Sequence, residues 1–112
     1  MKPFSWVQER ILELAELYPE RKAECSYFDD SGRPDCIVGH VLHELGAHPS
    51  SGEGGRIFNA NGNRWIDACT FAGGIDWTKF GVEAPQSKDA AWIDKVQHKQ
   101  DLGNCWADAV VG

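Results

Sequence analysis

Short segments with a helical spacing of apolar residues are the feature that most constrains the fold. From Phe4 to Tyr18, apolar side chains recur at about every third or fourth position, and charged residues such as Glu9 and Glu13 lie between them. This pattern predicts an amphipathic helix with one apolar face. Tyr18-Pro19 ends it, because proline disfavours the helical conformation of the residue before it. A chain made of such segments must bury each apolar face against another.

Helix caps and breakers predict four further helices. One runs from Cys36 to Leu45, with Asp35 as its N-cap and Gly46 as the left-handed residue that ends it. The other three are residues 64 to about 72 with Asn63 as the N-cap, a helix that is capped by Ser87 and runs to about residue 101, and a short last helix capped by Asn104. The predicted buried stripe of the helix capped by Ser87 consists of Ala90, Ile93, Val96 and Gln100.

The segments between these helices have the composition of turns and loops. Residues 29–32 predict a turn within a short hairpin or ordered loop over residues 23–35. Residues 47–63 are rich in Gly, Ser and Asn and predict a long surface loop, anchored by Ile57 and Phe58. We therefore expect a mainly α fold, in which residues 1–112 form a single compact domain of about five short helices with at most a small β-hairpin.

Composition and charge limit the classes of partner. The chain of 112 residues carries a formal net charge of −6 without a basic cluster, so its average field repels nucleic acid. Its apolar runs fall short of the roughly 18 residues of a membrane span, which argues against a membrane partner. The first residues lead into the amphipathic pattern rather than into a signal peptide, which indicates a cytoplasmic protein. In that compartment the four cysteines are expected to be free thiols.

The predicted helix over residues 36–45 has two different faces. At about 100° per residue, Cys36, Gly39, His40 and His43 fall on one side, and the apolar residues fall on the other. Cys36 and His40 lie one turn apart and are suited to zinc, with His43 one turn along and Cys25 or His48 contributed by neighbouring loops. The alternative is structural: the thiol packs in the core, Gly39 permits close approach of another helix, and the histidines form hydrogen bonds at the rim.

The same face suggests two further hypotheses. A thiolate of Cys36 at the helix N-terminus is favoured by the helix dipole and has His40 nearby as a base, although Asp35 opposes it. Gly39 allows close contact between two copies of the helix, which predicts a homodimer.

Aromatic residues are frequent for a chain of this length. Five tryptophans are present, and Trp77 and Phe80 lie in a connector without helical or strand periodicity. If exposed, Trp77, Phe80 and Trp106 mark a surface that binds a protein partner, because aromatic side chains are enriched at interfaces. The alternative is that they close the edge of the core where the helices are short.

Two stretches of the chain stand out, residues 34–46 (PDCIVGHVLHELG) and 96–110 (VQHKQDLGNCWADAV). Together these stretches resemble small uncharacterised proteins encoded by bacteriophages of actinobacteria. The resemblance covers roughly a quarter of the chain. It implies a viral accessory protein that acts in the cytoplasm of the bacterial host, and it implies no catalytic residues.

These observations favour a non-enzymatic protein-interaction module, with Trp77, Phe80, Trp106, His40 and His43 as candidate binding residues. The alternative is a small zinc-binding protein or metal-dependent enzyme that uses Cys36, His40 and His43.

Overall fold

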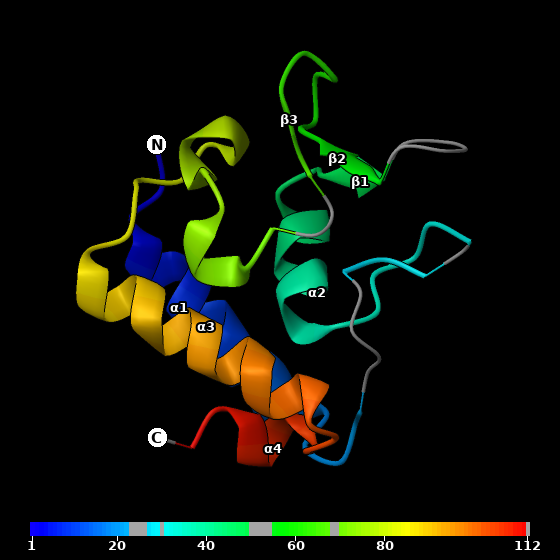
Figure 1. Cartoon of the computed structure of the whole chain (residues 1–112), viewed down its shortest axis with the longest axis vertical. Helices are drawn as coiled ribbons and strands as arrows, with labels where there is room; N and C mark the ends of the chain where they lie inside the picture. The colour runs from blue at the N-terminus through cyan, green and yellow to red at the C-terminus, as the bar shows by residue number, and fades with distance from the viewer. Residues whose placement is uncertain (23–26, 30, 50–54, 68–69, 112) are drawn as a thin grey trace.

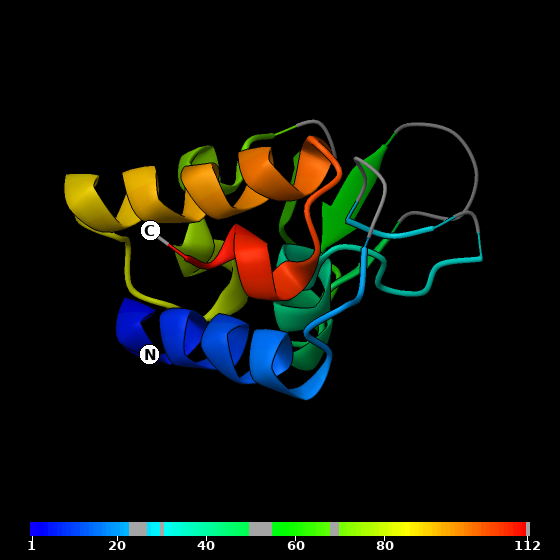
Figure 2. The same cartoon turned by 90° about the horizontal axis from the view of Figure 1, so that it is seen from below.

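Three helices stack in a layer, with a small sheet at one end (Figures 1 and 2). The computed structural model describes residues 1–22, 27–29, 31–49, 55–67 and 70–111. The layer consists of α1 (Phe4–Leu17), α4 (Trp106–Ala109) and α3 (Ser87–Asp101), with α4 in the middle. Helix α2 (Ile37–Glu44) packs against α1 beside the sheet. The described part of the chain has four α-helices, so the mainly helical prediction is confirmed in outline.

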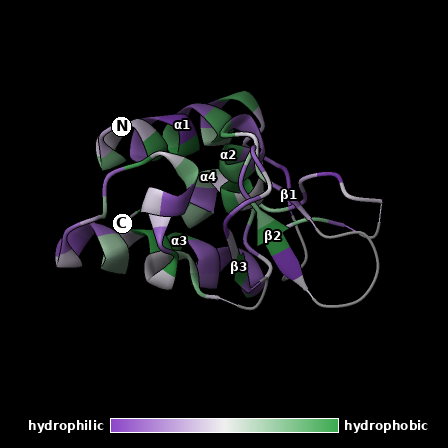
Figure 3. Cartoon of the chain, turned by 90° about the horizontal axis from the view of Figure 1, so that it is seen from above, coloured by the Kyte–Doolittle hydropathy of each residue, from purple (hydrophilic) through white to green (hydrophobic). Residues whose placement is uncertain are grey.

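Helix α1 has the predicted bounds and most of the predicted buried face, although Leu12, Leu17 and Tyr18 of the apolar stripe are exposed. It begins after Pro3 and buries Phe4, Val7, Ile11, Leu14 and Ala15. Colouring by hydropathy shows that hydrophobic (green) and hydrophilic (purple) residues are interspersed along the helices (Figure 3). In the described part, no helix combines the length and the apolar character needed to cross a membrane. The buried apolar residues form one cluster that joins the helices to the sheet.

Helix α2 is buried on more sides than its pattern predicts. Ile37, Val38, Val41 and Leu42 are fully buried, as expected. However, Cys36 and Gly39 are buried as well, and His43 and Glu44 are exposed. The alternative in which the Cys36 thiol packs in the core is therefore confirmed, whereas Gly39 lies against the backbone of Tyr27 rather than against another helix.

Gly39 makes the closest of these contacts. A Cβ at this position would lie 1.9 Å from the carbonyl oxygen of Tyr27. The close approach that we predicted between two copies is thus made within the chain. Gly39 is therefore not available for a contact between two copies, and the homodimer itself stays a prediction.

The N-terminus of α2 is capped by a thiol. The Sγ atom of Cys36 accepts a hydrogen bond from the backbone N–H of Gly39 at 3.2 Å. Cys36, and not Asp35, is therefore the N-cap. At the other end, Gly46 has a φ of +89°, which confirms the predicted left-handed residue.

A three-stranded antiparallel sheet occupies the region where a loop and a helix were predicted. Its strands are β1 (His48–Pro49), β2 (Arg56–Phe58) and β3 (Trp65–Asp67), in the order β1-β2-β3. Ile57 and Ile66 face each other on its buried side. The region predicted as a long surface loop over 47–63 contains β1 and β2, and its predicted anchor Ile57 is buried. The prediction of a helix over 64–72 is wrong, and the sheet exceeds a hairpin. Residues 68 and 69 lie outside the described part.

The turn between β2 and β3 explains this difference. The side chain of Asn59 accepts a hydrogen bond from the backbone N–H of Asn63 at 3.1 Å, and its amide donates to the Asn63 side chain at 2.9 Å. Asn63 is thus committed to the turn and does not cap a helix. After β3 the chain continues into two short 3-10 helices, η1 (Ala72–Gly74) and η2 (Trp77–Phe80).

Helix α3 runs over the predicted range, and Ile93, Val96 and Gln100 are buried as expected. Gln86 is its N-cap and Ser87 its first helical residue, so the prediction that Ser87 caps this helix is wrong. Ala90 of the predicted stripe is half-buried.

The last helix is capped by backbone carbonyls. The N–H groups of Trp106 and Ala107 donate to Arg21 and Pro19 at 2.9 and 3.1 Å. Asn104 donates from its side chain to the carbonyl of Lys99 at the end of α3, at 2.8 Å. The prediction that Asn104 caps α4 is therefore wrong, because its side chain closes the preceding helix.

The predicted turn after Phe28 is present in the described residues. The carboxylate of Asp29 accepts hydrogen bonds from the backbone N–H groups of Ser31 and Arg33, and Phe28 pairs with Pro34. Residues 23–26 and Asp30, which belong to the same predicted hairpin or loop, lie outside the described residues.

Candidate functional site

The three aromatic residues predicted to form a binding surface are buried. Trp77 and Trp106 are both 0% exposed, and Phe80 is 6% exposed. The indole N–H of Trp77 donates to the carbonyl of Ala72 at 3.2 Å, and its ring meets Phe4 edge-on. The prediction that these side chains are accessible is wrong, because η2 and α4 turn their aromatic residues into the core. The alternative reading, in which they close the core between short helices, is confirmed.

The predicted ligand set on α2 is split between core and surface. Cys36 is 2% exposed, whereas His43 is exposed and His40 is half-buried. Burial raises the pKa of the Cys36 thiol to about 12, so this group is neutral at physiological pH. This contradicts the hypothesis of a reactive thiolate at Cys36.

The zinc hypothesis remains a prediction. Among the described residues, no group of three or more His, Cys, Asp and Glu side chains is arranged to hold a metal ion. Cys25, a candidate fourth ligand, lies outside the described residues. Elemental analysis of protein purified without a metal-binding tag tests this alternative.

His40 contacts aromatic and charged neighbours at the end of the helical layer. Its ring meets Trp106 edge-on, with ring centroids 5.2 Å apart. The guanidinium of Arg21 lies over the same indole at 4.9 Å. Burial, followed by the positive charge of Arg21, lowers the pKa of His40 below its ordinary value of 6.5. The folded chain therefore favours the neutral imidazole.

This pKa predicts a pH dependence of stability. Because the unfolded chain binds the proton more readily than the folded chain, acid favours unfolding. We expect the free energy of unfolding to fall as the pH is lowered from about 7.5 to about 5, and to fall less in His40→Gln. Urea denaturation at a series of pH values measures both slopes. At the upper pH His40 is neutral in the folded and the unfolded chain, so the free energy of unfolding measured there is the reference for each protein. Equal pH dependence of this free energy in the wild type and His40→Gln would contradict the prediction.

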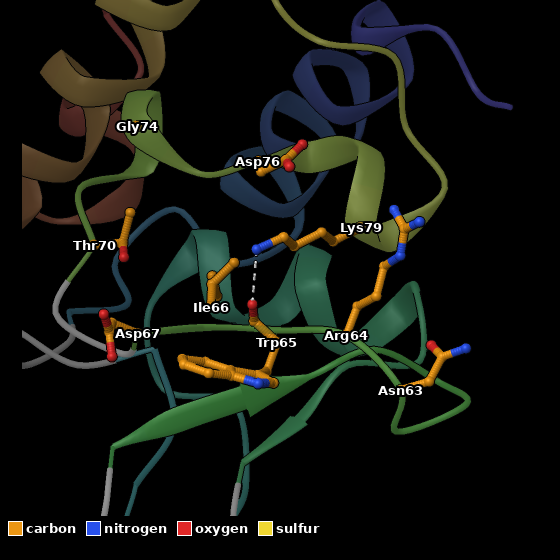
Figure 4. A pocket seen from close by; sticks show the side chains of 9 residues that line it. All are labelled: Asn63, Arg64, Trp65, Ile66, Asp67, Thr70, Gly74, Asp76 and Lys79. Atoms are coloured by element: carbon orange, nitrogen blue, oxygen red, sulfur yellow. Dashed lines mark hydrogen bonds between the residues drawn. The ribbon is translucent and has the colours of Figure 1, made fainter.

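A pocket lies along the free edge of the sheet, in a region that the sequence predicted to be helical. Its volume is about 510 Å³, and its walls are β3 and the segment from Thr70 to Lys79 (Figure 4). The close-up shows Arg64 and Asn63 at one end, Asp67 and Thr70 at the other, and Asp76 and Lys79 along the side of η2. Sequence reasoning missed this site. The sequence does contain a short signal for the two strands beside it. In Arg56-Ile57-Phe58 and in Trp65-Ile66-Asp67 an isoleucine stands between polar or aromatic residues, and a turn that contains Asn and Gly separates the two triplets.

The outer face of the sheet carries aromatic side chains beside this pocket. The strand register places His48, Phe58 and Trp65 next to one another on the face opposite to Ile57 and Ile66. His48 and Phe58 are stacked, with ring centroids 5.9 Å apart.

Trp65 also makes a cation–π contact. The guanidinium of Arg56 lies 4.1 Å from the centre of this ring. Trp65 is 38% exposed, and it is therefore the tryptophan that this surface offers to a partner.

The charged side chains of the pocket differ in how far their hydrogen-bonding groups are already occupied. Asp76 caps η2: its carboxylate accepts hydrogen bonds from the backbone N–H of Thr78 at 3.2 Å and from the Thr78 hydroxyl. Lys79 donates from Nζ to the carbonyl oxygen of Trp65 at 3.1 Å, which leaves two of its three N–H donors for other acceptors (Figure 4). Arg64 is exposed at one end of the pocket and Asp67 lies at the other, with the Lys79 ammonium between them at the Trp65 carbonyl (Figure 4). The Arg64 end is therefore cationic, and the Asp67 end is anionic.

Comparisons with protein-family models, curated proteins and solved structures find no match to this chain.

Proposed function

We propose that the chain is a non-enzymatic protein-interaction module and that it binds its partner at the pocket and the outer face of the sheet. The observation that carries this proposal is the half-exposed Trp65 beside an open pocket of about 510 Å³. Tryptophan and arginine are the side chains that most often dominate the binding energy of protein interfaces. Here they are already stacked on each other, so less side-chain freedom is lost on binding.

The composition of the surface supports a protein partner. Its centre is aromatic and its rim is polar, with Arg64 and Asn63 at one end and Asp67 at the other. This arrangement of an apolar centre and a polar rim is typical of protein–protein interfaces. The one nucleophile candidate named from the sequence, Cys36, lies in the core and does not line the pocket.

The resemblance of residues 34–46 and 96–110 to small proteins of actinobacterial phages supports a more specific form of the proposal. In that form the chain is a phage accessory protein that binds a host protein in the bacterial cytoplasm. The partner is then found in the lysate of an actinobacterium.

We expect Trp65→Ala to abolish capture of specific proteins from such a lysate. Truncation of a central tryptophan costs about 2 kcal/mol or more of binding energy, which is roughly thirtyfold in affinity. Leu102→Ala is the matched control, because Leu102 is 68% exposed and does not line the pocket. Quantitative mass spectrometry of proteins bound to the wild type and the two variants gives the result. The proposal fails if proteins bound to the wild type are retained by Trp65→Ala, or if the wild type captures none.

A further inference from the structure

Strand β3 forms one edge of the sheet. The order β1-β2-β3 places β2 on one side of it, and no described strand lies on the other. The pocket runs along this open side. An edge strand exposes backbone groups to which another extended segment can bind.

The register shows which backbone groups of β3 face the pocket. Asn59 donates from its N–H to the carbonyl of Arg64 at 2.9 Å. Since hydrogen-bonded pairs alternate with non-bonded pairs in antiparallel strands, Ile57 and Ile66 form the next bonded pair. The N–H and C=O groups of Trp65 and Asp67 therefore point away from β2 and toward the pocket.

The contacts of these outward groups agree with this assignment. The carbonyl of Trp65 accepts the hydrogen bond from Lys79, and that of Asp67 accepts one from the N–H of Thr70 at 3.1 Å. The register gives the N–H of Trp65 no acceptor in β2, and none of the other described residues accepts its hydrogen bond. In the described part of the chain, the edge therefore has an unpaired N–H donor beside a carbonyl that accepts a hydrogen bond from Lys79.

We propose that an extended protein segment adds to β3 as a fourth strand, and that an acidic side chain of this segment lies between Arg64 and Lys79. This inference rests on the proposed function, because it names the kind of segment that the surface binds. A strand that pairs with Trp65 needs the carbonyl that Lys79 covers in the free chain. The ammonium group leaves this carbonyl and binds the incoming carboxylate, so the segment that opens the edge also supplies a new partner for the lysine.

Charge favours this orientation of the segment. Arg64 lies at one end, the Lys79 ammonium lies between Arg64 and Asp67, and the carboxylate of Asp76 accepts hydrogen bonds from Thr78. Asp67 at the other end repels a second acidic group. The segment therefore carries its acidic residue where it passes Arg64.

The same surface is poorly suited to single-stranded nucleic acid. Bases bind by stacking on free ring faces. Here Arg56 covers a face of Trp65, and His48 covers a face of Phe58. In addition, the net charge of −6 repels a phosphate backbone.

A random peptide library displayed on phage, selected on the full chain and depleted on Trp65→Ala, supplies the probe. We expect the enriched peptides to contain more Asp and Glu than the input. For one enriched peptide, Lys79→Met should weaken binding by about tenfold, the size of one hydrogen bond to a charged group. Lys88→Met removes an exposed lysine of α3 and is the matched control, for which we expect unchanged affinity.

Two further measurements separate strand addition from simple charge attraction. Replacing the acidic residue of the peptide by its amide should weaken binding to the wild type by about tenfold and leave binding to Lys79→Met nearly unchanged. Hydrogen exchange of the Trp65 amide should become slower when the peptide is bound, because this N–H then donates to the added strand.

Three outcomes overturn the inference. If the enriched peptides depend on Trp65 but are not acidic, or leave the Trp65 amide unprotected, the inferred occupant is wrong and the proposed interaction surface stands. If no peptide depends on Trp65 and the lysate also yields no Trp65-dependent protein, the proposed function fails as well. If oligothymidylate binds more tightly than every enriched peptide at physiological ionic strength and requires Trp65, the occupant is a nucleic acid.

Discussion

Gly39→Ala should destabilise the fold by on the order of 3 kcal/mol, the upper part of the range for overpacking in a core. The added Cβ would lie 1.9 Å from the carbonyl oxygen and 2.8 Å from the carbonyl carbon of Tyr27. Both are backbone atoms, and the carbonyl also accepts a hydrogen bond from the N–H of Asp35 at 2.9 Å. Relief of the clash therefore requires α2 or the segment beneath it to move. Urea denaturation of the variant and the wild type measures the loss.

Gly74→Ala is the matched control for this substitution. A Cβ at Gly74 meets only the Thr70 methyl group at 3.7 Å, which is ordinary contact. We expect this variant to change stability by less than about 1 kcal/mol. If the two variants cost the same, α2 is not packed directly on the Tyr27 backbone.

The second large effect is expected for Leu42→Ala. Leu42 is 0% exposed on the side of α2 that packs into the core. Its truncation leaves a cavity among side chains that cannot fully collapse, which costs about 2–5 kcal/mol. This is a large share of the stability of a small domain. The free energy of unfolding from chemical denaturation gives the value.

His43→Ala provides the contrast within the same helix. His43 is the next residue along the chain and is exposed, so we expect a loss of under about 1 kcal/mol. A loss as large as that of Leu42→Ala would place the histidine in the core or in a metal site, contrary to the structure.

The helices with long apolar stripes could be predicted from the sequence, and the sheet could not. Helices α1 and α3 each carry enough turns for their spacing to be read, and their bounds agree with the prediction to within a residue. Strands of two or three residues leave almost no periodic signal. They are stable because they pair with one another and bury Ile57 and Ile66, which is a tertiary effect.

The candidate site was missed for the same reason. Its two cations, Arg64 and Lys79, lie on separate segments and line one pocket only when β3 packs beside η2. The sequence did not show which aromatic side chains are exposed, because their burial depends on where the short connecting segments turn. Trp77 and Trp65 have the same chemistry, yet the first is 0% and the second 38% exposed.

The position of α4 has a consequence for how the chain folds. This helix lies between α1 and α3, and its first N–H groups bind the carbonyls of Pro19 and Arg21. Contacts between segments so distant in sequence form late, because closing a long loop is entropically costly. Until they form, the apolar faces of α1 and α3 toward Trp106 stay open to water. During synthesis these faces are therefore exposed until residues 106–109 have left the ribosome, and exposed apolar faces favour aggregation in this interval.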